Sequence, residues 1–177
     1  MSPLYFRRFL MLTGRRTNFW LLAAIFVLVA CSCSQKPSPP KIGDRFPRNE
    51  LYELNGKKVT IPDDYRGKIL IIRFWQDCCS YNIHEMSSVD QMFDKYEKKG
   101  VAVVTVHTGK SRKVAEEFVA MLKIRYPVLL DSSSKIAKRC GIFVVPSTFI
   151  LDRDGNIRAK VFGEGKRNYE KLVAAFL

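Results

Sequence analysis

The feature that most constrains the fold of this chain is an almost unbroken apolar run, KILIIRFW, at residues 68–75. A run of this kind is typical of a β-strand that is covered on both faces. Two more apolar runs follow, VAVVTVH at residues 101–107 and YPVLLD at residues 126–131. Buried strands in succession need helices on both sides of their sheet, so the sequence predicts an α/β protein.

Segments with helical spacing connect these strands. Between residues 80 and 99, apolar side chains recur every three or four positions until Gly100, which is expected to end a helix. Residues 111–124 show the same spacing, and Ser111 stands where an N-cap is needed. Two further helical segments are expected, at residues 132–141 and 166–177.

Two hairpins are predicted to complete the sheet. Near its beginning, Asn55 and Gly56 separate LYEL from KKVTI, and this dipeptide is a strong hairpin signal. Near its end, residues 153–155 separate VPSTFILD from NIRAKVFG. The expected order is hairpin, strand, helix, strand, helix, strand, helix, hairpin and helix. This order predicts an α/β sandwich whose mixed central sheet is flanked by helices.

The first thirty residues are predicted to be a secretory signal peptide. They contain four arginines and no acid, and then about a dozen apolar residues, fewer than a membrane span requires. Their end, LVAC at residues 28–31, resembles the lipobox of bacterial lipoproteins, which implies cleavage before Cys31 and lipidation of Cys31. Two alternatives remain, an ordinary cleavage site near Cys31 or a segment that stays as an anchor.

Residues 31–40 are polar and rich in proline, and we expect them to be a lipidated tether. Residues 41–177 then form one domain. A lipid anchor on the membrane implies a location in the bacterial cell envelope, facing the periplasm or the exterior. Ser32 follows the lipidated position and resembles a signal for sorting to the outer membrane.

The chain is strongly basic, with a formal net charge of +13. Without residues 1–30 it has 26 basic against 17 acidic side chains, a net charge of about +9. The basic residues are spread along the chain and the signal directs export, so nucleic acid is not expected as a partner. An anionic lipid surface is one interpretation of the charge, and a solvated surface without a specific partner is the other.

Three segments in order resemble the thioredoxin superfamily, in particular its exported, membrane-tethered proteins of the TlpA and ResA type. They are GDRFPRNELYELNGKKVTIPDDYRGKILIIRFW, FWQDCCSYNIHEM and GIFVVPSTFILDRDGNI. The resemblance covers residues 41–177 and includes an additional strand and helix at residues 128–139. It implies a thioredoxin-like fold and thiol–disulfide exchange with protein thiols or disulfides of the envelope, without a metal or other cofactor.

The same resemblance assigns roles at the site. Cys79 takes the place of the nucleophilic cysteine, and Asn82 takes the place of the second, resolving cysteine. Pro146 is expected to be a cis proline that faces Cys79 and, with Val145 and Trp75, binds the substrate. Glu85 matches the family at its position. Cys78 stands where the family has tryptophan, and Arg73 stands where thioredoxin itself has a buried acid.

The chemistry expected at Cys79 follows from its place at the start of a helix. Unpaired N–H groups and the helix dipole stabilise a thiolate there. Arg73 either lowers the pKa of Cys79 further or faces the solvent. Asn82 cannot carry out the second half of a disulfide exchange, because its amide forms only hydrogen bonds. The candidate resolving thiols are Cys78, Cys140, Cys33 on the tether, and an external thiol, and Cys140 is alternatively a small core residue.

The two histidines are candidate bases for the thiol. His84 is expected on the surface of the first helix. His107 ends the second buried strand, at the same edge of the sheet as Cys79, where it either approaches the site or is a satisfied strand-end residue. A metal-binding cluster of His107 with Cys78, Cys79 and Cys140 is a further alternative.

Two other functions stay open beside thiol–disulfide exchange. A redox-inactive domain of this fold could use the proline groove to hold a partner chain. A thiol peroxidase of the peroxiredoxin type would use one cysteine at this helix start. The peroxiredoxin motif has threonine three positions before its cysteine, where this chain has Gln76, and this difference weakens the peroxidase interpretation.

Overall fold

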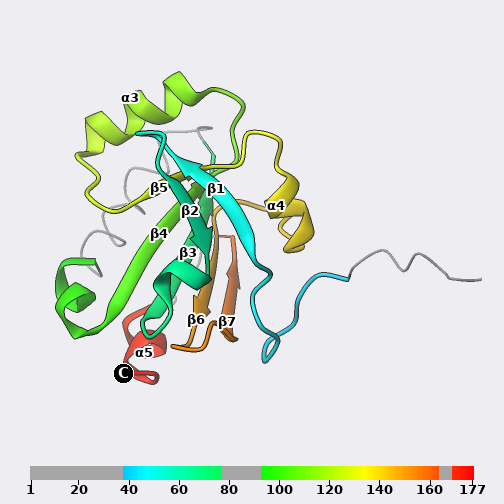
Figure 1. Cartoon of the computed structure of the whole chain (residues 1–177), viewed down its shortest axis with the longest axis vertical. Coiled ribbons are helices and arrows are strands. Elements are labelled where there is room, and N and C mark those ends of the chain that lie inside the picture. Colours follow the sequence, from blue (N-terminus) through cyan, green and yellow to red (C-terminus); the bar gives the residue numbers. More distant parts are fainter. Residues whose placement is uncertain (1–37, 77–92, 164–168) are drawn as a thin grey trace, which may run out of the picture. The chain divides into compact units, whose positions relative to one another are not determined.

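The structure is a computed structural model that describes residues 38–76, 93–163 and 169–177. One seven-stranded sheet runs through the described domain in the order β2-β1-β5-β4-β3-β6-β7 (Figure 1). Strands β3, β4 and β5 are parallel to one another, whereas the other neighbouring pairs are antiparallel. The strands are β1 Asn49–Glu53, β2 Lys58–Ile61, β3 Ile69–Trp75, β4 Val101–His107, β5 Val128–Leu130, β6 Ser147–Leu151 and β7 Ile157–Phe162. The mixed sheet predicted from the sequence is confirmed.

The helices follow the expected spacing wherever the structure describes them. They are α3 Arg112–Leu122, α4 Lys135–Arg139 and α5 Tyr169–Ala174, with the 3-10 turns η1 Asp63–Tyr65 and η2 Glu97–Lys99. The Ser111 hydroxyl accepts a hydrogen bond from the Val114 N–H at 3.3 Å, which confirms the predicted N-cap of α3. Most of the helix expected at residues 80–99 lies outside the described residues. Its last part ends at Gly100, which has a φ of +78°.

The burial of β3 on both faces of the sheet explains why its apolar run is unbroken. Successive side chains of a strand point to opposite faces of the sheet, and all seven residues of β3 are buried. Leu70, Ile72 and Phe74 pack in one core layer with α4 and the N-terminal hairpin. Ile69 and Ile71 pack in a second layer with side chains from α3, α5 and residues 93–96. Helices therefore cover both faces of the central strand.

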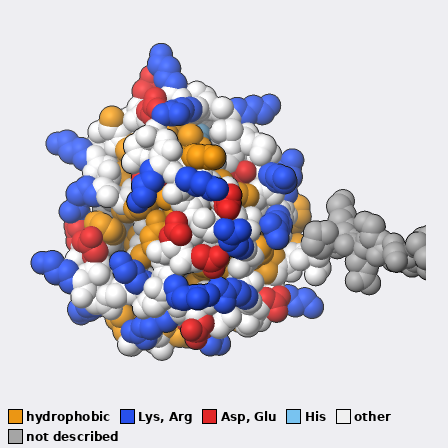
Figure 2. All heavy atoms as spheres, in the orientation of Figure 1, with side chains coloured by type: hydrophobic (Ala, Val, Ile, Leu, Met, Phe, Trp, Pro, Cys, Tyr) orange, Lys and Arg blue, Asp and Glu red, His pale blue; other side chains and the backbone are white. Residues whose placement is uncertain are grey.

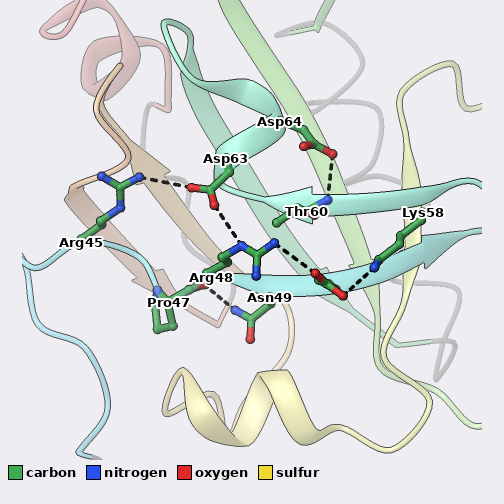
Figure 3. A network of polar contacts seen from close by, with 9 residues as sticks. Arg45, Pro47, Arg48, Asn49, Lys58, Thr60, Asp63 and Asp64 are labelled. Atoms are coloured by element: carbon green, nitrogen blue, oxygen red, sulfur yellow. Dashed lines mark hydrogen bonds and ion pairs between the residues drawn. The ribbon is translucent and has the colours of Figure 1, made fainter.

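The N-terminal hairpin extends the sheet beyond β5. Gly56 takes a φ of +87° in its turn, a conformation that favours glycine. A chain of ion pairs covers the outer surface of this hairpin and of η1, and we call it the hairpin network (Figure 3). Its ion pairs are Arg45–Asp63, Arg48–Asp63, Arg48–Glu50 and Lys58–Glu50. The hydrogen bond and charge of Lys58 lower the pKa of Glu50.

Residues 38–46 run along the domain before the first strand. Backbone hydrogen bonds join this segment to the beginning of β7, from Gly43 N to Ile157 O at 2.8 Å and from Ile157 N to Asp44 O at 2.9 Å. Pro40 is buried, and its carbonyl accepts a hydrogen bond from the Lys160 ammonium group. Residues 38–40 of the expected tether thus belong to the same compact unit as the domain.

The surface of the described domain carries charge of both signs. Figure 2 shows Lys and Arg side chains scattered over the visible face, with Asp and Glu side chains among them. In residues 38–76, 93–163 and 169–177, no helix has the length and the apolar character needed to cross a bilayer. The predicted signal peptide, lipobox and Ser32 lie outside the described residues.

Candidate active site

The candidate site lies at the end of the sheet where β3 and β4 finish and β6 begins. Trp75, the last residue of β3, is aligned with His107, the last residue of β4. On the other side of β3, Phe74 is aligned with Ser147, the first residue of β6. Cys79 follows the end of β3 by four residues, and Pro146 directly precedes β6. The strand that leads to Cys79 and the strand that leaves Pro146 are therefore neighbours.

Several expected site residues have no described position. Cys78, Cys79, Asn82, His84 and Glu85 lie outside the described residues. The described side of the site consists of the strand ends and the loop before β6. The structure thus places the frame of the candidate site, and the roles expected for the residues of the 77–92 segment remain predictions.

The loop before β6 has the expected proline geometry. The peptide bond between Val145 and Pro146 is cis, which confirms the conformation predicted for Pro146. The Ser147 hydroxyl donates a hydrogen bond to the Val144 carbonyl at 2.5 Å and closes the loop. Val145 is half-buried against the core, whereas Phe143 and Val144 are 87% and 55% exposed. The loop therefore presents apolar side chains to solvent next to the cis proline.

Arg73 is buried, with 2% of its surface exposed. The interpretation that it faces the solvent is therefore wrong, because β3 is an interior strand and is covered on both faces. Arg73 is aligned with Thr105 of β4 and Thr148 of β6. Its Nη1 donates a hydrogen bond to the Thr148 hydroxyl at 3.3 Å. A permanent positive charge thus lies inside the sheet near its carboxyl edge.

Trp75 is 1% exposed and packs between two aromatic rings. Its ring centroid lies 4.6 Å from that of His107 and 4.8 Å from that of Phe118 on α3. A side chain buried to this degree offers no surface to a substrate. Trp75 fills the space between the strand end and α3. The substrate-binding role expected for Trp75 stays a prediction.

His107 lies at the expected edge of the sheet. It is fully buried against Trp75, and its carbonyl accepts a hydrogen bond from the Asp131 N–H at 2.8 Å. The position predicted for His107 at the strand end is confirmed, and an approach to Cys79 stays a prediction. Within the described residues, no group of three or more His, Cys, Asp or Glu side chains is arranged to hold a metal ion.

Cys140 is a core residue. It is 1% exposed and packs with Ile136 and Ala137 of α4 against the sheet. Burial raises the pKa of the Cys140 thiol to about 12, so the thiol stays protonated and is a poor nucleophile at neutral pH. The burial supports the alternative that Cys140 is a small core residue, and its catalytic role stays a prediction. The apolar spacing of residues 136, 137 and 140 in a short helix is the signal that could have shown it.

Three threonines at this edge were not singled out from the sequence. Thr148 accepts the hydrogen bond from Arg73, and Thr105 lies on the other side of Arg73 in the register. Thr108 binds the end of β3, because its N–H and its hydroxyl both donate to the Trp75 carbonyl, at 2.9 and 3.2 Å. The signal for Thr105 was a polar residue within an otherwise apolar strand.

The comparisons with known proteins agree with this geometry. A relative named thiol-disulfide oxidoreductase ResA, from Bacillus thuringiensis subsp. konkukian, is 26% identical over 158 residues, which cover 84% of this chain and 91% of the relative. A protein of the same name from Bacillus cereus is 28% identical over 129 residues, 73% of this chain and 74% of the relative. These names are consistent with the enzyme class expected from the sequence.

Solved structures show the fold. A Chlorobium tepidum chain described as a candidate thiol:disulfide interchange protein DsbE aligns with a TM-score of 0.72 at 24% identity, over 77% of this chain and 97% of that one. The thioredoxin domain of a Bacteroides vulgatus thiol-disulfide oxidoreductase aligns with a TM-score of 0.69 at 21% identity, over 77% and 99%. The fold is thus thioredoxin-like, as expected. Residues 42–160 match the model of the AhpC/TSA family, and the chain belongs to this family.

Proposed function

We propose that this protein is a cell-envelope thiol–disulfide oxidoreductase with Cys79 as its single nucleophile. The observation that carries the proposal is the placement of Pro146 directly before β6, which pairs with β3, the strand that leads to Cys79. The relatives named thiol-disulfide oxidoreductases support the reaction class. The lipobox-like LVAC and the polar tether support anchoring in the envelope by lipidation of Cys31.

The first step is attack by the Cys79 thiolate on a disulfide of a substrate protein. A new bond forms between the Cys79 sulfur and one substrate sulfur, and the substrate disulfide breaks. The second substrate sulfur leaves as a thiolate and takes a proton from water. The substrate main chain lies against Val145 and Pro146, whose loop is held by the hydrogen bond from Ser147 to Val144.

The second step needs another thiol, because Asn82 stands where a resolving cysteine is expected. The buried Cys140, with its pKa of about 12, is unsuited to this role. An external thiol is the best candidate, whether a small molecule or a protein thiol. Its thiolate attacks the Cys79 sulfur, a disulfide forms between Cys79 and the external thiol, and the substrate leaves as a thiolate that takes a proton from water. A second external thiolate then attacks the bound external sulfur, a disulfide of the two external thiols forms, and Cys79 is released as a thiolate. Cys78 and Cys33 remain internal alternatives.

A disulfide-reduction assay on the full chain tests the proposal. A protein disulfide serves as substrate and glutathione as the external thiol, and the variants are Cys79→Ser, Cys78→Ser and Cys140→Ala. We expect Cys79→Ser to abolish turnover and Cys140→Ala to keep it. Turnover by Cys79→Ser equal to that of an active wild type sinks the proposal, whereas an absence of turnover in the wild type favours the redox-inactive binding domain. The same variants assayed with hydrogen peroxide separate disulfide exchange from peroxidase activity.

A further inference from the structure

Three exposed apolar side chains lie close together at one end of the sheet, and we call them the apolar patch. They are Phe143, Val144 and Phe162, which are 87%, 55% and 52% exposed. Phe162 is aligned with Ser147 in the register of β6 and β7. A Cβ atom added to Gly163 would lie 3.9 Å from the Val144 side chain. The end of β7 therefore borders the loop that carries Phe143 and Val144, and neighbouring exposed apolar side chains are typical of an interaction surface.

The first described residues of the chain run beside this patch, on the side of the sheet that α4 covers (Figure 1). The Pro39 side chain packs against Gly141, where an added Cβ would lie only 2.7 Å from the Pro39 Cβ. The patch begins two residues after Gly141. The Lys160 ammonium group donates to the Pro40 carbonyl, and Lys160 and Phe162 lie on the same face of β7. The chain thus enters the domain next to both parts of the patch.

The segments that surround the patch are basic. Residues 38–43, 138–144 and 159–163 contain Lys41, Lys138, Arg139 and Lys160 but no Asp or Glu. The first three of these basic side chains are exposed, and Lys160 is half-buried. Apolar side chains with basic neighbours fit a bilayer that contains anionic lipids, because the apolar groups enter the acyl boundary and the basic groups attract the headgroups.

The length of the chain before residue 38 favours the same partner. Seven peptide units separate the lipid anchor proposed at Cys31 from Ser38, and they span at most about 25 Å. A compact domain of this size is roughly 35 Å wide, so the anchor is shorter than the domain that it holds. The face around Ser38 is thus kept close to the bilayer, and at such a high local concentration even a weak surface attraction suffices for docking.

We propose that the apolar patch and its basic neighbours dock on the surface of an anionic bilayer, an inference that rests on the lipid anchor of the proposed function. The side chains of Phe143, Val144 and Phe162 enter the boundary between headgroups and acyl chains. Val145 and Pro146 directly follow Val144, so docking brings the proline loop to the bilayer surface. The substrates within its reach are then proteins whose disulfides lie close to the membrane.

The test measures the quenching of tryptophan fluorescence by brominated lipids, with the full chain reconstituted in vesicles of phosphatidylcholine and phosphatidylglycerol. Phe143→Trp places the reporter in the apolar patch. Met121→Trp is the matched control, because Met121 is 57% exposed on α3, which packs on the other face of the sheet. Trp20 and Trp75 are common to both variants, so the difference between them reports the new side chain. Circular dichroism confirms that each variant is folded.

We expect the brominated lipids to lower the fluorescence of the Phe143→Trp reporter about twofold, because a docked amphipathic surface lies about 5–10 Å deep in the bilayer boundary. The Met121→Trp reporter should not be quenched. Quenching of Phe143→Trp should decline in vesicles of phosphatidylcholine alone, and also in about 1 M salt, because both conditions remove the attraction between basic side chains and anionic headgroups.

Double variants of the Phe143→Trp chain test the basic neighbours. Lys41→Gln with Lys138→Gln removes two exposed charges beside the patch, whereas Lys113→Gln with Lys123→Gln removes two exposed charges from α3 and its end. Each basic residue near an anionic surface strengthens binding about fivefold, so the first pair should lower the ratio of docked to undocked chains about twentyfold. The second pair should leave this ratio unchanged.

Flotation of the vesicles in high salt shows separately whether the chain is anchored. If the chain floats and the reporters of Phe143→Trp and Met121→Trp are quenched equally, the inference is overturned and the proposed anchor stands. If neither reporter is quenched, the patch is open to a protein partner such as the substrate. A chain that does not float rejects the anchor and the inference together, whereas the Cys79→Ser assay tests the reaction by itself. The two failures are therefore distinguishable.

Discussion

The N-terminal hairpin and the carboxyl edge of β3 both carry charged side chains, but they hold them in different ways. In the hairpin network, the side chains are 35–63% exposed and pair with several partners in solvent (Figure 3). At the strand edge, Arg73 is 2% exposed and is fixed against Thr148. Exposed ion pairs are screened and contribute little, whereas a buried charge interacts strongly with each group around it. The number of charged residues in the sequence therefore does not predict which charges interact strongly with their surroundings.

The largest effect is expected from Arg73→Ala. This change leaves a cavity in the sheet and removes the hydrogen-bond donor of the Thr148 hydroxyl, so the free energy of unfolding should fall by about 3 kcal/mol. Urea denaturation of the full chain measures it. A loss below about 1 kcal/mol would mean that the buried edge tolerates change as the exposed hairpin does.

The second prediction concerns the buried thiol of Cys140 and its pH dependence. Its folded-state pKa is raised to about 12 by burial, above that of an unfolded thiol, so the unfolded state loses the proton first as pH rises. The contribution to stability is complete below about pH 8.5 and declines above it, by about 1.4 kcal/mol per pH unit. Wild type should thus lose about 2 kcal/mol relative to Cys140→Ala between about pH 7 and about pH 10, as measured by urea denaturation. A constant difference between the two proteins would show that the thiol ionises in place.

A smaller effect is expected from Gly56→Ala in the hairpin turn. Gly56 has a φ of +87°, and no atom lies within 4 Å of the position that a Cβ would take, so strain and not crowding decides the outcome. The free energy of unfolding should fall by about 1 kcal/mol. Thermal unfolding measures the change, and Asn55→Ala, which leaves Gly56 in the turn, is a useful companion. An unchanged melting temperature in Gly56→Ala would mean that the turn adapts without strain.

The smallest effect is expected from Asp63→Asn in the hairpin network. This change removes the ion pairs with Arg45 and Arg48, and it should lower the free energy of unfolding by about 0.5 kcal/mol. The difference, measured by urea denaturation, should vanish in about 1 M salt, because solvent-exposed charges are screened there. A loss as large as that of Arg73→Ala, persisting in salt, would remove the contrast between the two regions.

The sequence predicted the fold well because its signals are local. The apolar run of β3, the Asn55-Gly56 turn and the Ser111 cap each depend on a few neighbouring residues, and all three are confirmed. The cis conformation of Pro146 was predicted through the resemblance, and it is also confirmed.

The candidate site was harder to predict because it depends on burial across strands. A single arginine near the end of an apolar run is compatible with solvent, and only its place between β4 and β6 buries it. The resemblance predicts a substrate contact for Trp75, whereas the structure shows Trp75 buried against Phe118 of α3. Cys140 was selected for its thiol, although the packing of α4 decides its character.

The attachment of residues 38–46 has a mechanical consequence. A pull from an anchored N-terminus reaches the domain through the backbone bonds of Gly43 and Asp44 to Ile157 and of Phe46 to Gly155. These bonds form a short ladder at the beginning of β7, so the load passes into the β6–β7 hairpin at the end opposite Pro146. Under force, the ladder is expected to peel open before the proline loop is distorted. In the proposed lipid-anchored protein, this ladder would take up a load on the N-terminus before the load reaches the proline loop.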